Sequence, residues 1–530
     1  MGEQFKQRSA YNVKSLDIYN PRNLCGIVSG RCFAVLGKTS PTMRTDTFSN
    51  FLHGPPSPLI IARPRPSTNP LELYANIASA RHPSFLLESG GGRSMGRYSY
   101  FSTDPYYRLS GIGNHFVEQP SRSHTTSGVV PFQRLAQLFA HQRIARPPDA
   151  PPFFGGAVGY LSYDLVRQFE TLPSLASPHL IVPDLEFAFF DLVAAIDHEQ
   201  NHLILMFCPP LTRFVSEPRE QLLREGRDRL AEFEARLMRA GTVDTQPDDL
   251  GLLTFTPEQE RSAYIQNVRR CQDYIAAGDI YQANLSHRFT VNNAPLRQGH
   301  LQADLSAYRR LRTLNPSPFS GLLRLDTVRL ISSSPERLVR LDGRHADTRP
   351  IAGTRPRGNT LVEDQRLIEE LRANEKERAE HIMLVDLERN DLGRVCRFGS
   401  VHADEIMTLE QYSHVSHLVS HVAGTLTEQA TGFDLLKAMF PGGTITGVPK
   451  VRCMEIIEEL EPVRRGLYTG SMGYLSWSGD LDFNILIRTL TMTNGTGYLQ
   501  VGAGIVADSD PAREYEETLH KAQAFFSAFG

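Results

Sequence analysis

Short apolar runs separated by glycine and proline fill the first half of the chain. The clearest are Ser84–Glu88, Gly155–Ser162, Leu185–Phe190 and Leu203–Phe207, and each predicts a β-strand. Beyond them, charged residues alternate with apolar ones at helical spacing over Arg219–Ala240, which predicts an amphipathic helix. The first half is therefore expected to be mainly sheet.

Helices and strands alternate in the second half. Apolar side chains recur at helical spacing over Pro257–Ala277, which predicts a helix. Strands are expected at Phe319–Arg324, Val328–Ser332 and Leu338–Leu341, followed by one long helix over Glu363–Leu387. This mixture predicts an α+β or mixed α/β protein.

These patterns divide the chain into regions. Residues 1–50 are expected to be a poorly ordered N-terminal extension, or the result of an over-long start, and 51–241 form the first folded region. The polar residues 242–255 predict a linker. The informative motifs lie in the last region, 256–530.

Composition excludes several classes of function. The chain has 530 residues and a formal net charge of −3, so it shows no basic field for nucleic acid. Its six cysteines are scattered without a CxxC pair, which favours free thiols in a reducing cytoplasm. No apolar run approaches the roughly 18 residues of a membrane span. We expect a cytoplasmic protein that binds neither nucleic acid nor membrane.

Two predicted helices carry glutamates three positions apart, Glu377 with Glu380 and Glu514 with Glu517. Residues at this spacing share a helix face, so each pair can direct two carboxylates to one point. Mg²⁺ prefers such hard oxygen ligands. The alternative is a solvated helix face, and Asp510, followed by proline, is typical of a helix N-terminus.

Glycine-rich segments and a few polar side chains complete the candidate chemistry. Phe440–Lys450 can present backbone N–H groups to an anion, or it can be a tight turn. Gly502–Val506 allows close approach to a strand, although strand glycines also serve packing. Arg488 ends a run that predicts a strand, and it can bind a carboxylate or form a surface ion pair. His414 and His417 alone make a weak zinc site.

Taken in order, these segments resemble the chorismate-binding enzymes, the family of anthranilate, aminodeoxychorismate, isochorismate and salicylate synthases. The resemblance rests on Gly278–Ser286, Ser333–Arg337, Arg349–Gly358, Glu377–His381, Met383–Arg394, Tyr412–His417, Pro441–Lys450, Tyr468, Arg488 and Gly502–Lys521. It implies an anthranilate-synthase-like α+β fold, with two large packed β-sheets and helices on the outside. It also implies that 51–241 is the N-terminal region of this family and 256–530 the chorismate-binding catalytic domain.

The resemblance also implies a magnesium cofactor and a general acid. Glu380 and Glu517, helped by Glu377 and Glu514, would hold Mg²⁺ against the ring carboxylate of chorismate. Glu336 would protonate the departing C4 hydroxyl group, because unprotonated hydroxide is a poor leaving group.

The other motif residues would act on the substrate directly. His417 would assist the elimination of pyruvate by positioning or by proton transfer. Binding roles are implied for the remaining residues: Tyr468, Arg488, Gly504 and Lys521 at the substrate carboxylates, and Gly353 and Thr354 around the ring.

Gln282 favours amination over hydration. Relatives that add water place a lysine base near this position, and a glutamine cannot deprotonate water. Ammonia is then the expected nucleophile. Because the chain shows no glutamine amidotransferase segment, the expected partner is a separate glutaminase subunit.

Ala352 bears on which ring carbon is aminated. In the family a lysine here commonly accompanies amination at carbon 4, and an alanine accompanies amination at carbon 2, which gives anthranilate. Several phrases look more like aminodeoxychorismate synthase: Tyr281–Ser286, Pro318–Gly321, Pro335–Arg337, Gly470–Tyr474 and Asp508–Pro511. We give the residue at the reacting centre more weight and predict an anthranilate synthase, with aminodeoxychorismate synthase as the alternative.

Two further expectations follow from the resemblance. Ser89, Pro318 and Phe319 fall where anthranilate synthases bind tryptophan, but Phe319 and Ser320 stand in place of the usual Tyr-Met, which speaks against feedback inhibition. A different class of function is a non-catalytic, chorismate-binding scaffold for the glutaminase. The complete set of glutamates speaks against that class.

Overall fold

Antiparallel β-strands form the core of the protein in this computed structural model, which describes residues 45–89, 96–119, 124–125, 129–239, 250–358, 360–411 and 415–529. The described residues all belong to one compact unit, Met43–Gly530. Most of the predicted N-terminal extension and much of the predicted linker lie outside the described residues. The predicted region boundaries therefore stay predictions.

The first sheet has twelve strands. In spatial order these are β1 (Leu59–Pro64), β10 (His202–Phe207), β9 (Leu192–Asp197), β3 (Tyr98–Thr103), β2 (Ser84–Glu88), β13 (Phe319–Arg324), β14 (Val328–Ser334), β23 (Thr489–Thr493), β24 (Thr496–Ile505), β12 (Gln282–Asn292) and β11 (Thr254–Pro257), with β20 (Gly447–Val448) pairing with β12.

The second sheet also has twelve strands. In order they are β17 (Ile351–Pro356), β19 (Val415–Thr425), β16 (His345–Thr348), β15 (Arg337–Asp342), β22 (Leu481–Asn484), β21 (Ser471–Ser476), β7 (Gly156–Leu161), β8 (Leu185–Phe190), β4 (Tyr107–Ile112), β5 (His115–Gln119) and β6 (His124–Thr125), with β18 (His402–Gln411) pairing with β19.

Both sheets combine strands from the two halves of the chain. In the first sheet β2 pairs with β13, and in the second β7 pairs with β21, both antiparallel. Buried apolar side chains from both halves form one large core cluster. The N-terminal half therefore completes the sheets on which the second half places its motifs.

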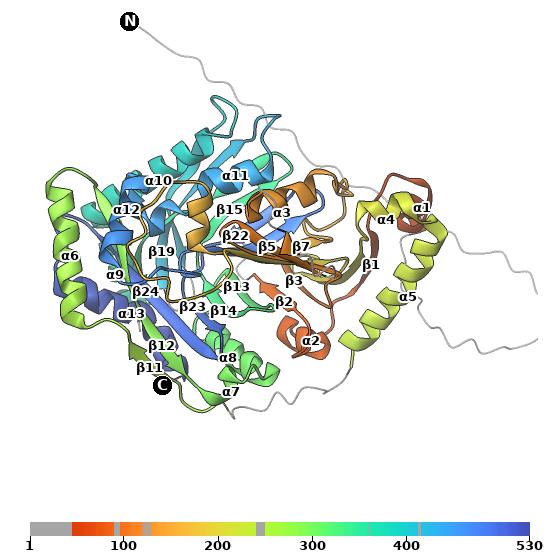
Figure 1. The fold of residues 1–530 in the computed structure, drawn as a ribbon, viewed down its shortest axis with the longest axis horizontal. Helices are drawn as coiled ribbons and strands as arrows, with labels where there is room; N and C mark the ends of the chain where they lie inside the picture. Colours follow the sequence, from red (N-terminus) through yellow and green to blue (C-terminus); the bar gives the residue numbers. More distant parts are fainter. Residues whose placement is uncertain are drawn as a thin grey trace, which may run out of the picture. The chain divides into compact units, whose positions relative to one another are not determined.

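Helices lie outside the strands. They are α1 (Thr45–His53), α2 (Pro70–Ile77), α3 (Pro131–Ala140), α4 (Leu211–Ser216), α5 (Arg219–Leu237), α6 (Arg261–Ala276), α7 (Ala294–Arg297), α8 (Leu301–Leu314), α9 (Leu361–Ala373), α10 (Glu375–Gly393), α11 (Gly432–Met439), α12 (Lys450–Leu460) and α13 (Pro511–Phe529), with 3-10 turns η1 (Tyr163–Gln168) and η2 (Gly443–Ile445). Helix α5 packs against β10, α6 packs against β12 and β24, and α13 packs against β24. In Figure 1, α5 lies beside β1, and α13 lies beside β24. None of the helices in the described ranges combines the length and apolarity of a membrane span.

The fold class is confirmed, as are the predicted strands other than the run that ends at Arg488, and two helix predictions need correction. The segment predicted as one helix over Glu363–Leu387 is two helices, α9 and α10, separated by Asn374. Asn374 has extended backbone (φ −70°, ψ 103°), and its side chain accepts a hydrogen bond from the N–H of Glu377 at 3.0 Å. A cap of this kind starts a new helix. The helix predicted from Pro257 begins at Arg261, because Thr254–Pro257 pairs with β12 as β11.

A buried arginine joins three parts of the second half. Arg465 is 2% exposed and binds Glu461 through Nε at 3.1 Å and Nη2 at 2.8 Å. Its Nη1 also donates to the carbonyl of Ile445 at 2.8 Å, and its Nη2 to that of Asn284 at 2.6 Å. The side chain thereby ties the loop after α12 to η2 and to β12.

We predict that Arg465→Leu lowers the free energy of unfolding by about 3–5 kcal/mol, because Glu461 would be left as a buried, unpaired charge. Equilibrium urea unfolding measures this loss. The control is Arg397→Leu, whose arginine pairs with Glu428 at 3.5 Å on an exposed surface. It should cost at most about 1 kcal/mol. Equal losses in the two variants would contradict the prediction.

Candidate active site

Two glycines of β24 open a space over the backbone of the first sheet. A Cβ on Gly504 would lie 2.6 Å from Nε2 of Gln282 and 3.5 Å from Oε1 of Glu380. A Cβ on Gly502 would lie 2.8 Å from the hydroxyl oxygen of Tyr468. Only glycine leaves room for these side chains. Three residues predicted to bind substrate or metal therefore lie close together at the end of β24: Glu380, Tyr468 and Gly504.

Helix α10 brings the first glutamate pair to this place. Oε1 of Glu380 accepts a hydrogen bond from Nε2 of Gln282 at 2.6 Å. Oε1 of Glu377 accepts one from Nη1 of Arg355 at 2.7 Å, and its Oε2 is buried without a hydrogen bond to any described residue. That oxygen lies 2.4 Å from where a Cβ of Gly353 would be, and Gly353 has φ +65°.

Helix α13 brings the second pair. Asp510 accepts hydrogen bonds from the N–H groups at the start of the helix, as predicted from its position before proline. Glu514 is buried, whereas the exposed Glu517 pairs with Nζ of Lys521 at 2.9 Å. Lys521 also donates to the carbonyl of Gly502 at 3.0 Å, so its amine lies against β24.

The carboxylates of the four glutamates are suitable ligands for a divalent cation, although they do not form a close cluster. Among the described residues, no three of them bring carboxylate oxygens within 4.8 Å of one another. The buried oxygen of Glu377 that lacks a hydrogen bond is the feature that a hard cation would satisfy.

Glu336 and Arg488 lie where the chain passes between the two sheets. Glu336 is between β14 of the first sheet and β15 of the second. The run ending at Arg488 was predicted to be a strand, but β22 ends at Asn484, and Arg488 precedes β23 with φ +50°. The two crossovers bind each other, because Ser333 N–H donates to the Arg488 carbonyl at 3.1 Å. Ile485 N–H donates to the Glu336 carbonyl at 3.0 Å.

Burial sets the protonation state of Glu336. Its side chain is 6% exposed, and burial raises its pKa to about 7, an effect opposed by the Thr444 hydroxyl and by the charge of Arg488. The same burial lowers the pKa of Arg488. A carboxyl group with this pKa is partly protonated at neutral pH and can act as a general acid.

His417 is a neutral imidazole beside the same arginine. It is buried on β19, and burial together with the charge of Arg488 lowers its pKa to about 3. Its partner in the strand register is Thr354, and Ala352 pairs with Leu418. The register shifts between Ala352 and Thr354, at Gly353. The side chains of Ala352 and Thr354, and all of His414, lie outside the described residues.

Sequence reasoning missed some polar residues around this site. Arg355 holds Glu377, and Glu388 lies buried near Glu336. Glu388 falls within the motif Met383–Arg394, but the pattern gives no sign that this one position faces inward.

The three residues predicted at a tryptophan pocket do lie together. Ser89, Pro318 and Phe319 line one cavity of about 360 Å³, whose walls also include Tyr98 and Tyr474. Residues of both sheets contribute to it.

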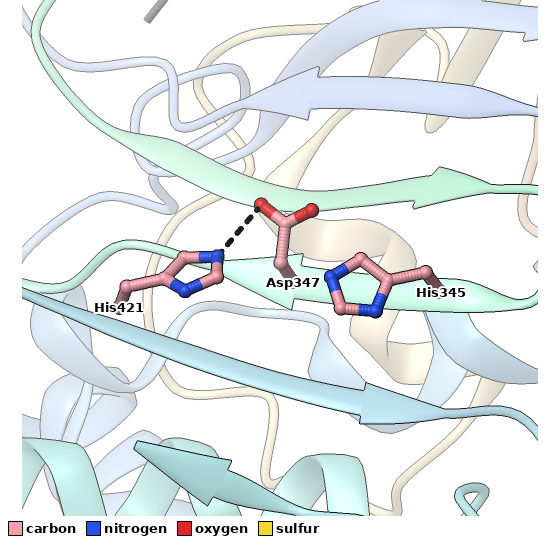
Figure 2. A group of neighbouring side chains, drawn as sticks. All are labelled: His345, Asp347 and His421. Atoms are coloured by element: carbon pink, nitrogen blue, oxygen red, sulfur yellow. Dashed lines mark ion pairs between the residues drawn. The ribbon is translucent and has the colours of Figure 1, made fainter. Parts of the chain in front are cut away.

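A second polar cluster lies at β16 and β19. Figure 2 shows Asp347 between His345 and His421, with an Asp347–His421 ion pair of 3.7 Å. The carboxylate of Asp347 also accepts hydrogen bonds from Arg337 at 3.1 Å and from Arg340 at 2.8 Å. Because two arginines already satisfy this carboxylate, the cluster is best explained as an ion-pair network, and we assign no metal to it.

Comparison with known proteins agrees with this geometry. The sequence model of the family described as chorismate binding enzyme matches residues 83–527. Anthranilate synthase component 1 of Thermus thermophilus is 44% identical over 87% of this chain and 95% of its own. Aminodeoxychorismate synthase component 1 of Bacillus subtilis is 41% identical over 86% and 93%.

A solved structure agrees as well. Anthranilate synthase component I from Streptococcus pneumoniae has a TM-score of 0.71 at 31% identity, covering 81% of this chain and 92% of its own. The family match and the high identity of these relatives lead to one conclusion. The chain belongs to the chorismate-binding enzymes, of the anthranilate and aminodeoxychorismate synthase type.

Proposed function

We propose that this protein aminates chorismate at carbon 2 and eliminates pyruvate to give anthranilate, using ammonia from a separate glutaminase subunit. The observation that carries the proposal is Gln282, whose amide donates a hydrogen bond to Glu380 at 2.6 Å. By the family resemblance, members that add water have a basic lysine at this position. An amide cannot deprotonate water, whereas ammonia needs no base to attack. Ala352 supports attack at carbon 2, because it offers no amine that could take that position itself.

The chemistry divides into two steps. The nitrogen of ammonia bonds to carbon 2 and releases one proton to solvent, the two ring double bonds shift, and the C4–O bond breaks as Glu336 gives its proton to the departing oxygen, which leaves as water. The proton at carbon 2 is then lost, the C3–O bond breaks, and the enolpyruvyl group takes up a proton at its methylene carbon and leaves as pyruvate from the aromatic product. His417, neutral and buried, can position the ring or accept that proton.

We assign binding of the dianionic substrate to the positively charged groups and the metal site. Arg488, Lys521 and the hydroxyl of Tyr468 would hold its carboxylates, with Gly504 giving backbone access. Mg²⁺, held by Glu380 and Glu517 with the help of Glu377 and Glu514, would neutralise the ring carboxylate and stabilise developing charge.

Aminodeoxychorismate synthase remains the second candidate. It is favoured by the 41% identity to the Bacillus subtilis enzyme, close to the 44% identity to the Thermus thermophilus enzyme. The assignment of Ser89, Pro318 and Phe319 to a tryptophan pocket stays a prediction.

Product analysis tests the proposed function. The purified protein, given chorismate, Mg²⁺ and ammonium, should form anthranilate and pyruvate in equal amounts without any added lyase. Fluorescence and chromatography identify the product. Aminodeoxychorismate that becomes 4-aminobenzoate only after a lyase is added would replace our choice with the second candidate.

We predict that Glu380→Gln or Glu517→Gln lowers kcat/KM for chorismate on the order of 100-fold, because each change removes a charge that holds the metal. Raising the Mg²⁺ concentration should restore part of the rate. The matched control is Glu516→Gln on the same helix α13, an exposed glutamate that pairs with Arg261 at 3.5 Å. If the wild-type protein binds chorismate without turnover and the variants bind it equally well, the protein is a scaffold.

The pH dependence follows from Glu336. Its active form is protonated, so chorismate consumption should fall as pH rises through about 7. The measurement must hold the concentration of free ammonia constant, because the fraction of free ammonia in an ammonium solution rises steeply with pH over this range. Since His417 stays neutral well below this range, it adds no acid limb above pH 5. A rate that stays level to pH 9 would contradict the role of Glu336.

A further inference from the structure

One arginine joins β17 to both helices that follow it, and the proposed chemistry gives it no role. Nη1 of Arg355 donates a hydrogen bond to Oε1 of Glu377 on α10 at 2.7 Å, and its Nε donates one to Oε1 of Glu370 on α9 at 3.0 Å. Strand β17 packs against both helices. Arg355 therefore spans the break at Asn374 and ties the first turn of α10 to the strand.

The contacts of Glu377 leave one of its carboxylate oxygens unused. Arg355 binds Oε1, and Nδ2 of Asn374 lies 3.5 Å from the same oxygen. Oε2 is buried and has no hydrogen bond to a described residue. It lies against β17, in the space that the missing Cβ of Gly353 leaves open. The donors thus hold one oxygen and fix the carboxylate in one orientation.

That orientation matters because Glu377 belongs to the proposed metal site. Glu377 is three residues before Glu380, so the two side chains share one face of α10. Glu380 already lies at the end of β24, where it binds Gln282. A carboxylate that holds a hard cation, directly or through a bound water, must keep its lone pairs directed at the site. The hydrogen bond from Arg355 supplies this constraint.

Glu370 cancels the charge that Arg355 would otherwise bring to a cation site. An uncompensated guanidinium near Mg²⁺ would repel the ion. The side chains of Arg355 and Glu377 are 18% and 21% exposed and that of Glu370 is 50% exposed, so water screens these charges only in part. Arg355 and Glu370 together carry no net charge. Glu377 therefore keeps its negative charge for the metal while its orientation is fixed.

We infer that Arg355 is a positioning residue for the metal ligand Glu377, and that Glu370 is the counterion that makes this role compatible with a bound cation. The inference rests on the magnesium site of the proposed function and extends it to two residues that do not touch the metal. Without Arg355, the Glu377 carboxylate could rotate, and its buried oxygen would lose its fixed direction.

The test is the affinity of the protein for Mn²⁺, a paramagnetic substitute for Mg²⁺, measured by electron paramagnetic resonance with chorismate but without ammonium. Arg355→Leu should weaken Mn²⁺ binding about 10-fold, because the ligand loses the hydrogen bond that orients it. Arg355→Lys keeps the charge but cannot hold both carboxylates, so it should recover only part of the affinity. The matched control is Arg389→Leu, whose arginine pairs with Asp386 at 3.0 Å on the exposed side of α10 and should not affect the metal.

Glu370→Gln tests the counterion separately. Its side chain is half exposed, so the variant should fold like the wild-type protein. Mn²⁺ binding should weaken about threefold, a small effect because the pair is partly solvated, since the charge of Arg355 is no longer cancelled. Tighter or unchanged binding in this variant would contradict the role of Glu370.

Unchanged Mn²⁺ affinity in Arg355→Leu, together with a lower free energy of unfolding, would mean that Arg355 only joins the helices, and would overturn the inference. Tighter binding would overturn it as well, because Arg355 would then compete with the metal. Should Arg355→Leu not fold, Arg355→Lys and Glu370→Gln decide, and wild-type affinity in both rejects the inference. A wild-type protein that binds no Mn²⁺ removes the metal site and this inference together, whereas a product other than anthranilate changes only the proposed function.

Discussion

The paired crossovers between the two sheets are the constraint on which the site depends. A chain that leaves one sheet for another gives up its strand partners, and its backbone groups must find new ones. Here the two crossovers satisfy each other, through Ser333 with Arg488 and Ile485 with Glu336. The acid and the arginine are therefore held together by backbone hydrogen bonds before any side-chain attraction acts. Their shared burial accounts for the raised pKa of Glu336 and the lowered pKa of Arg488.

A second constraint is the hydrogen-bond network around Arg465. Arg465 is a buried charge, and such charges are tolerated when their hydrogen bonds are used. Its bonds to Glu461, Ile445 and Asn284 connect the glycine-rich loop to β12, and its guanidinium lies 5.6 Å from the ring centre of Tyr468. The loop that carries Thr444 and the strand that carries Gln282 are thus placed by one side chain.

Local patterns in the sequence were enough to predict many elements. Ser84–Glu88 and Phe319–Arg324 are strands with the predicted limits, because their apolar runs end at turn-forming residues. Local patterns could not show that these two strands pair with each other, which depends on contacts across the whole chain. The break at Asn374 was missed because the charged residues that follow it fit a solvated helix face, and only the cap geometry reveals a new helix. Resemblance to a family, and not spacing, supplied the roles of Glu336 and His417.

The resemblance to a whole family also explains why the choice between amination at carbon 2 and at carbon 4 depends on so few residues. Relatives that carry the names of the two amination enzymes are 44% and 41% identical to this chain, so the shared framework cannot separate them. Both reactions need a protonated acid, a bound dianion and ammonia, so the residues proposed for these roles do not distinguish the two enzymes. The two reactions differ in the nucleophile that attacks carbon 2. Position 352 lies in β17 next to Gly353, whose positive φ shifts the strand register opposite His417. A lysine at this position could supply an amine of its own, whereas under the proposed function the alanine leaves carbon 2 to ammonia.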